Sequence, residues 1–232
     1  GMVTAMTGDG GNDAPSIKSA DIGVGMGITG TDVTKNVADM VLADDNFATI
    51  VSAVEEGRRI YDNIRKSIQF LLSSNLSEVM AIFTANLLGF TILKPVHLLW
   101  INLVTDCFPA LALSMEKGEK NLMKRPPRKS SDGIFAGGVG FDVVYQGLFV
   151  TLLTLAAYFI GHFMEAGRWE LTESADGMTM AFLTMSMCEI FHSFNMRSQH
   201  GSTVSMLLHG SFNKYILGST VLSLITTALV IE

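Results

Sequence analysis

Charged residues and cysteines are scarce in this sequence. Only 16% of its 232 residues are Asp, Glu, Lys or Arg, whereas about 25% are charged in a soluble domain. The net charge is −6, and no tract rich in Lys and Arg occurs, which argues against a nucleic-acid-binding protein. The two cysteines, Cys107 and Cys188, both lie in apolar stretches and form no CxxC pair. They therefore define neither a disulfide framework nor a redox compartment.

Apolar residues make up 48% of the chain and are concentrated after about residue 66. Before that point, three short apolar runs at 2–6, 22–26 and 40–43 are bounded by Gly or Asp. Such runs predict the strands of a buried, mostly parallel sheet. We therefore expect residues 1–57 to belong to a soluble α/β domain.

Local signals in this domain predict where its helices begin. Asp13 is expected to cap the helix that follows it, with Pro15 in the first turn. Asp45 or Asn46 is expected to begin a second helix, which is interrupted near Gly57.

Residues 58–232 are expected to form a stalk helix and a membrane domain. No Pro or Gly occurs from Arg58 to Leu88, which predicts one helix of about 45 Å, polar at first and then apolar; two separate helices are the alternative. Four further apolar stretches each have close to the roughly 20 residues that a bilayer requires. They are 95–114, 138–161, 178–196 and 212–231. The predicted fold is thus a bundle of about five transmembrane helices after a partial α/β domain.

The loop charges predict the orientation of the bundle. Residues 115–132 carry six basic and three acidic side chains, whereas residues 162–177 carry four acidic side chains and one Arg. By the positive-inside rule the first loop is cytoplasmic and the second lies outside. The N-terminal domain is then cytoplasmic as well, in a multi-pass membrane protein.

Carboxylates inside the apolar stretches are the strongest functional signal, because an ionised carboxylate in hydrocarbon is costly and usually lines an ion path. The oxygen-bearing side chains on three predicted helices are Asn75 and Glu78, then Asn102, Thr105 and Asp106, then Glu189. Their spacing places the members of each group on one helix face. Oxygen ligands suit hard cations such as calcium. Polar contacts between helices are the alternative explanation for the amides and the hydroxyl.

Pro109 strengthens the expectation of a cation site. It has no N–H to donate to the carbonyl of Thr105, four residues earlier, and so leaves that carbonyl free. Broken helices of this kind form cation sites in many transporters.

A second signal is the loop TGDGGNDAP, which follows the first predicted strand. Its glycines allow close approach of the backbone, and Asp9 lies where a strand ends, a natural position for a hard metal ion. Asn12 can bind a phosphoryl oxygen, and Asp13 can orient the loop or support the metal.

With MVLADDNFATIVSAVEEGRRIYDNI, this loop resembles the phosphorylation domain of P-type cation-transporting ATPases, which is haloacid dehalogenase-like. The membrane motifs SSNLSEV, LLWINLVTD and MKRPPR look like those of calcium pumps of the sarco/endoplasmic reticulum type. The resemblance implies that Asp9 binds the catalytic Mg²⁺, that Asn12 and Asp13 support the phosphorylated site, and that ATP drives transport. It also implies calcium ligands at Asn75, Glu78, Asn102, Thr105, Asp106 and Glu189. A plasma membrane is expected if the source is bacterial.

The sequence departs from this family in several places. Gly11 stands where the family usually has Val, which adds freedom beside the magnesium loop. The DKTGT motif with the phosphorylated Asp, the nucleotide-binding domain and the TGE and PEGLP motifs are absent. We therefore expect a C-terminal fragment that needs the N-terminal part of the same pump. Calcium and manganese are not distinguished, and a membrane-tethered phosphatase and an ATP-independent cation channel remain as alternative functions.

Overall fold

The structure is a computed structural model, and it describes all residues except 1–2, 120, 130, 199–212 and 232. The chain divides into two compact units, Gly1–Arg58 and Arg59–Glu232. Each unit has its own architecture, and the boundary between them falls within one helix, α3, which runs from Phe47 to Leu88.

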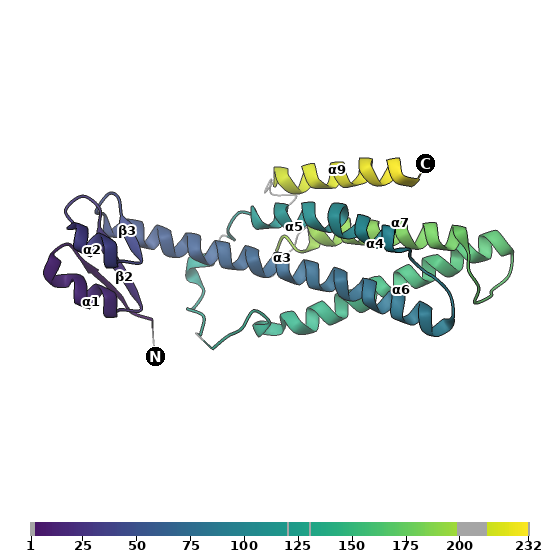
Figure 1. The fold of residues 1–232 in the computed structure, drawn as a ribbon, viewed down its shortest axis with the longest axis horizontal. Coiled ribbons are helices and arrows are strands. Elements are labelled where there is room, and N and C mark those ends of the chain that lie inside the picture. Colours follow the sequence, from purple (N-terminus) through teal and green to yellow (C-terminus); the bar gives the residue numbers. More distant parts are fainter. Residues whose placement is uncertain (1–2, 120, 130, 199–212, 232) are drawn as a thin grey trace. The chain divides into compact units, whose positions relative to one another are not determined.

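The first unit contains a three-stranded parallel sheet in the order β1-β2-β3. The elements are β1 (Ala5–Gly8), η1 (Gly11–Asp13), α1 (Ala14–Ser19), β2 (Ile22–Met26), α2 (Asp32–Val37) and β3 (Met40–Leu42). The predicted second and third strands are confirmed (Figure 1). The first strand lies further along the chain than predicted, because Thr7 and Gly8 pair with Val24 and Gly25 of β2.

Of the two residues predicted to cap helices in this unit, one does so and the other does not. Asn46 caps α3, since its side-chain oxygen accepts a hydrogen bond from the Ala48 amide at 3.0 Å. Asp13 does not cap α1. Its carboxylate turns back and accepts from the amides of Asp9 at 3.3 Å and Gly10 at 3.0 Å.

The predicted interruption near Gly57 is wrong, because α3 continues through that position. A glycine in a helix costs about 1 kcal/mol relative to alanine, and the good helix formers on both sides outweigh that cost. The predicted uninterrupted helix up to Leu88 is confirmed.

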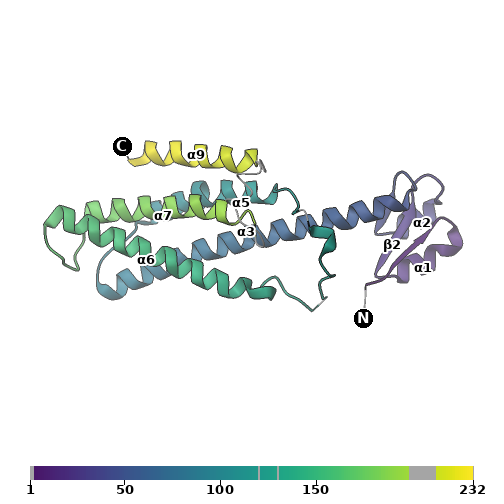
Figure 2. The same cartoon turned by 180° about the vertical axis from the view of Figure 1, so that it is seen from behind.

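The second unit is helical throughout its described elements (Figures 1 and 2). After α3 come α4 (Pro95–Trp100), the π-helical turn η2 (Ile101–Asp106), α5 (Cys107–Ser114), η3 (Leu122–Lys124), η4 (Ala136–Gly138), α6 (Val139–Ala166), α7 (Ala175–Asn195) and α9 (Lys214–Ile231). In both views α6 and α7 lie side by side, and α9 lies along α5.

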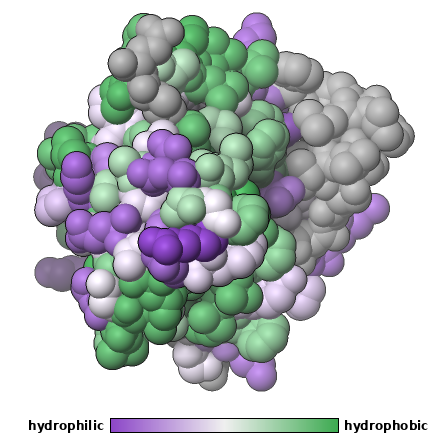
Figure 3. Space-filling view, turned by 90° about the vertical axis from the view of Figure 1, so that its right-hand side faces the viewer, coloured by the Kyte–Doolittle hydropathy of each residue, from purple (hydrophilic) through white to green (hydrophobic). Residues whose placement is uncertain are grey.

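Three helical stretches in the described residues are long and apolar enough to cross a membrane: Phe47–Leu88, Pro95–Ser114 and Ala136–Ala166. Lys214–Val230 is a shorter apolar helix. Large apolar side chains such as Val79, Phe141 and Leu152 are more than half exposed. Seen from the end at which α6 joins α7, polar side chains gather at the centre and apolar ones around much of the rim (Figure 3). This distribution fits a protein whose outer solvent is lipid.

Small side chains let α3 and α6 approach closely. A Cβ atom on Gly147 of α6 would lie 3.0 Å from the Leu76 side chain of α3. The Thr151 hydroxyl of α6 also lies 3.2 Å from the carbonyl oxygen of Ser77 on α3. Packing of small residues and bonds between helices are the main sources of helix association in lipid.

A buried ion pair joins the ends of α5, α7 and α9 to the interior of α3. The Arg197 guanidinium contacts both carboxylate oxygens of Glu116 at 3.1 Å, and the two side chains are 2% and 1% exposed. Asn213, next to the start of α9, donates to Glu116 at 2.8 Å and to the Ala112 carbonyl of α5 at 3.1 Å. Asn63 of α3 donates to the Glu116 carbonyl at 2.7 Å.

We expect Arg197→Met to lower the free energy of unfolding by about 3–5 kcal/mol, because it leaves the Glu116 carboxylate buried without its cation. The double variant Arg197→Met/Glu116→Leu should recover a large part of that loss. Thermal unfolding of the purified protein measures both effects. A double variant less stable than Arg197→Met alone would contradict this account of the pair.

Candidate cation site

Three carboxylates from three separate elements meet inside the second unit. Glu78 lies on α3, Asp106 ends η2, and Glu189 lies on α7. One oxygen of each lies within 4.8 Å of the others, and the residues are 6%, 1% and 1% exposed. The sequence predicted this convergence, and the structure confirms it.

The local backbone explains how Asp106 and its neighbour Thr105 both face inward. They end the π-helical turn η2, which is wider than an α-helical turn, and their exposed fractions are 1% and 0%. Pro109 follows three residues after Asp106, and its missing N–H prevents regular α-helical bonding to the Thr105 carbonyl. Single π-helical turns inside α-helices are common at functional sites.

Ser74 of α3 lies between two of the carboxylates. Its hydroxyl oxygen is 2.7 Å from Oδ2 of Asp106 and 2.6 Å from Oε1 of Glu189. A hydroxyl has one proton and can donate to only one of them at a time. The second short approach therefore requires a proton on a carboxyl group or a cation held between the oxygens.

Asn102 and Thr105 surround the same cluster. The Asn102 amide donates to both carboxylate oxygens of Glu78 at 2.9 Å. The Thr105 hydroxyl lies 3.0 Å from Oε2 of Glu189 and 3.0 Å from the Ile101 carbonyl. Both predicted residues thus contact the carboxylates directly.

The donor set of the cluster is suited to a hard divalent cation. Three like charges so close together in an apolar surrounding require compensation, yet no basic side chain is bonded to them in the described residues. Oδ1 of Asp106 is buried and has no hydrogen-bond partner among the described residues. Oxygen atoms of carboxylates, amides and hydroxyls are the ligands of Ca²⁺, which accepts six to eight of them in flexible geometry.

Asn75 is the predicted residue that the structure does not bring to the cluster. Its side chain is exposed, and its amide donates to the Leu71 carbonyl of its own helix at 2.7 Å. It lines an apolar groove with Leu76 and Val143 instead. Ser74, which the sequence analysis missed, takes the inward position. The signal for it was the spacing of four residues from Glu78, which places both on one helix face.

The predicted phosphate loop lies in the first unit. The Asp13 carboxylate holds the amides of Asp9 and Gly10, whereas the Asp9 carboxylate has no hydrogen-bond partner among the described residues. Asp9 and Asp13 line a hollow of about 460 Å³ with Thr29 and Asp45. Asn12 is exposed in η1. Carboxylate and hydroxyl oxygens at this hollow fit Mg²⁺, which prefers oxygen ligands and retains several waters.

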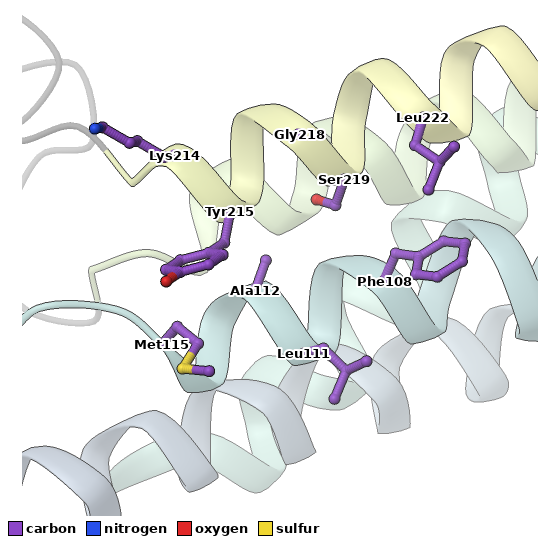
Figure 4. Close-up of a pocket in the computed structure, with 9 residues that line it drawn as sticks. All are labelled: Phe108, Leu111, Ala112, Met115, Lys214, Tyr215, Gly218, Ser219 and Leu222. Carbon is purple, nitrogen blue, oxygen red and sulfur yellow. The ribbon is translucent and has the colours of Figure 1, made fainter.

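A second hollow, in the second unit, is lined mostly by apolar side chains. A groove of about 360 Å³ lies between α5 and α9, lined by side chains that include Phe108, Leu111, Met115 and Leu222 (Figure 4). Lys214 and Ser219 are among its polar members, and it contains no carboxylate. This groove therefore offers no ligand set for a divalent cation.

Comparisons with known proteins identify relatives along the whole chain. The family described as "Cation transporting ATPase, C-terminus" matches residues 90–232. Calcium-transporting ATPase 1 of Bacillus cereus is 46% identical over 100% of this chain and 27% of its own length. Calcium-transporting ATPase 4, endoplasmic reticulum-type, of Arabidopsis thaliana is 44% identical over 91% of this chain and 20% of its own.

A fungal relative is also named as a calcium ATPase. The endoplasmic reticulum calcium ATPase srcA of Aspergillus fumigatus is 45% identical over 89% of this chain and 21% of its own length. The chain thus spans about a quarter or less of the curated relatives it matches. The resemblance drawn from the sequence motifs is confirmed.

We expect Ser74→Ala to lower the free energy of unfolding by about 1–3 kcal/mol, because one buried carboxylate loses its hydrogen-bond donor and the other loses a polar neighbour. Ser114→Ala is the matched control, since its hydroxyl is exposed and bonded only to the Leu111 carbonyl at 2.6 Å; the control should stay within about 0.5 kcal/mol. Thermal unfolding in detergent with a chelator compares them. Equal effects of the two substitutions would contradict the role of Ser74.

Proposed function

The chain belongs to the cation-transporting ATPases through their C-terminal region, and on this basis we propose that it forms the membrane part of an ATP-driven calcium pump. The observation that carries the proposal is the cluster of Glu78, Asp106 and Glu189 inside the helices. The names of its relatives, which are calcium-transporting ATPases, favour calcium as the ion.

In this proposal the cluster binds the transported ion. Glu78, Asp106 and Glu189 supply the charged oxygens, and Asn102, Thr105 and Ser74 supply neutral ones. The carboxylates compensate the charge of the cation, and the cation relieves their mutual repulsion. Asn75 is left out of this ligand set because its amide points to its own helix.

The first unit has side chains suited to the phosphorylation chemistry of such a pump. We assign residues 1–57 to the end of a haloacid dehalogenase-like phosphorylation domain in the cytoplasm. Asp9 would hold Mg²⁺, Asn12 would contact the phosphoryl group, and Asp13 would keep the loop in shape. When bound, the magnesium ion neutralises charge on the phosphoryl oxygens. The phosphorylated Asp and the ATP site would come from the N-terminal part of the pump.

Five membrane helices would follow, with α7 and α9 in addition to the three long apolar stretches. A membrane-tethered phosphatase has no need of three buried carboxylates, and a passive channel has no need of the phosphate loop. Neither alternative accounts for both features in one chain.

We expect Glu78→Gln, Asp106→Asn and Glu189→Gln, each in the full-length pump, to weaken calcium binding by about tenfold or more. Loss of one charged ligand costs at least about 1.4 kcal/mol. Glu165→Gln is the control, since that carboxylate lies near the end of α6 and accepts from Ser174 at 2.5 Å. Equilibrium binding of radioactive calcium measures the effect. Wild-type affinity in Glu189→Gln would overturn the proposed site.

The unbroken helix α3 supports a mechanical link between phosphorylation and the cation site. We expect two glycines inserted after Gly57 to lower the number of calcium ions moved per ATP. The glycines make the helix more flexible, and the insertion rotates the part of α3 after Gly57 relative to the part before it. Gly57→Ala is the control, as open space surrounds that position, and it should leave the ratio unchanged. Vesicle transport and ATP hydrolysis are measured together. An unchanged ratio in the insertion variant would exclude coupling through α3.

A further inference from the structure

Asp45 has an unusual backbone conformation for its residue type. Its φ is 51°, and it is the one described residue other than glycine with a positive φ. It lies between the end of β3 and the start of α3. The left-handed region is sparsely populated by residues with a side chain, although Asp tolerates it better than most. Such conformations cluster at functional sites, where the surrounding structure enforces them.

The conformation aims the Asp45 carboxylate at the loop after β2. Oδ1 accepts from the amides of Gly27 at 2.6 Å and Ile28 at 2.9 Å. Oδ2 accepts from the amide and the hydroxyl of Thr29, both at 2.7 Å. The Ile28 amide, with those of Thr29 and Gly27, lowers the pKa of Asp45 to about 2, so the carboxylate is ionised at neutral pH.

This loop is tightly packed, and its Gly27 amide also donates to the Leu42 carbonyl at 2.8 Å. A Cβ on Gly27 would lie 2.5 Å from the Leu42 carbonyl oxygen, and one on Gly30 would lie 2.0 Å from that of Met26. The backbone thus passes directly over the ends of β2 and β3. No side chain fits at either glycine, and the Asp45 carboxylate adds four hydrogen bonds that fix the turn together with the Gly27–Leu42 bond.

The far end of the loop, at Thr31, is hydrogen-bonded to the backbone of Asp9. The Thr31 amide donates to the Asp9 carbonyl at 2.9 Å, and the Thr34 hydroxyl lies 3.4 Å from the same oxygen. Asp45 therefore reaches Asp9 through one continuous segment, residues 27–31. Asp9, Thr29 and Asp45 line the same hollow.

We propose that Asp45 is a positioning residue that sets the place of Asp9 through the segment 27–31. Its two oxygens already accept four hydrogen bonds, so it acts through the backbone and not as a metal ligand. This role rests on the proposed function, in which Asp9 holds magnesium. Groups that orient a metal ligand typically change metal affinity by about tenfold or more when they are removed.

The first test needs no magnesium. In the full-length pump with a chelator, Asp45→Gly keeps the left-handed conformation and removes the carboxylate. Hydrogen exchange of the amides of Ile28, Thr29 and Thr31 should then become faster, whereas the Gly27 amide keeps its bond to the Leu42 carbonyl. Asp44→Asn is the matched control, because Asp44 bonds the Asn46 amide at 3.1 Å and the Thr49 hydroxyl at 2.6 Å instead. Unchanged exchange at Thr31 in Asp45→Gly would overturn the link to Asp9.

The second test concerns the metal. Phosphorylation of the pump by inorganic phosphate should need about tenfold more Mg²⁺ in Asp45→Gly than in the wild type. Asp45→Asn, which retains one acceptor oxygen, should recover part of the difference, and Asp44→Asn should match the wild type. A lower melting temperature with an unchanged magnesium requirement would mean that Asp45 is only structural, and would overturn the proposal.

These outcomes separate the inference from the proposed function. If the wild-type pump itself shows no magnesium-dependent phosphorylation, the proposed function fails, whereas the exchange experiment still decides whether Asp45 fixes the loop. If Asp45→Gly does not fold, the same two measurements on Asp45→Asn decide, and wild-type values in both would overturn the proposal.

Discussion

The repulsion among three buried carboxylates governs the second unit. Glu78, Asp106 and Glu189 have oxygens within 4.8 Å of one another, and apolar helices surround them. Such a group is stable only with positive charge, in the form of a cation or of protons. In the proposed pump, exchange of the compensating charge would let the cluster bind and release an ion, which a permanent pairing with Lys or Arg would prevent.

The rest of the unit keeps this cluster in place. The π-helical turn η2 brings Thr105 and Asp106 inward together, and Ser74 bridges two of the acids. Elsewhere in the unit, the Glu116–Arg197 pair, with Asn63 and Asn213, holds the ends of α5, α7 and α9 against α3. In that pair the charge is compensated within the protein. Glu116 thus has a cationic partner in the protein, whereas no basic side chain is bonded to Glu78, Asp106 or Glu189 among the described residues.

Sequence patterns predicted elements more reliably than the direction of single side chains. The parallel strands, the long helix and the convergence of three acids followed from apolar runs and spacing. Asn75 and Ser74 are adjacent, and a helix rotates by 100° between them, so spacing alone did not decide which one faces Asp106. Asp13 has the residue type of a helix cap, yet its carboxylate turns to Asp9 and Gly10. The positive φ of Asp45 left no sequence signal, since it depends on the distant residues 27–29.

The most direct measurement is anomalous diffraction from crystals of the full-length pump grown with Mn²⁺, a hard divalent cation with a strong signal. The account predicts a peak enclosed by Glu78, Asp106 and Glu189, about 2.0–2.6 Å from at least one oxygen of each. Occupied metal sites elsewhere in the pump, with no peak among these three side chains, would contradict it.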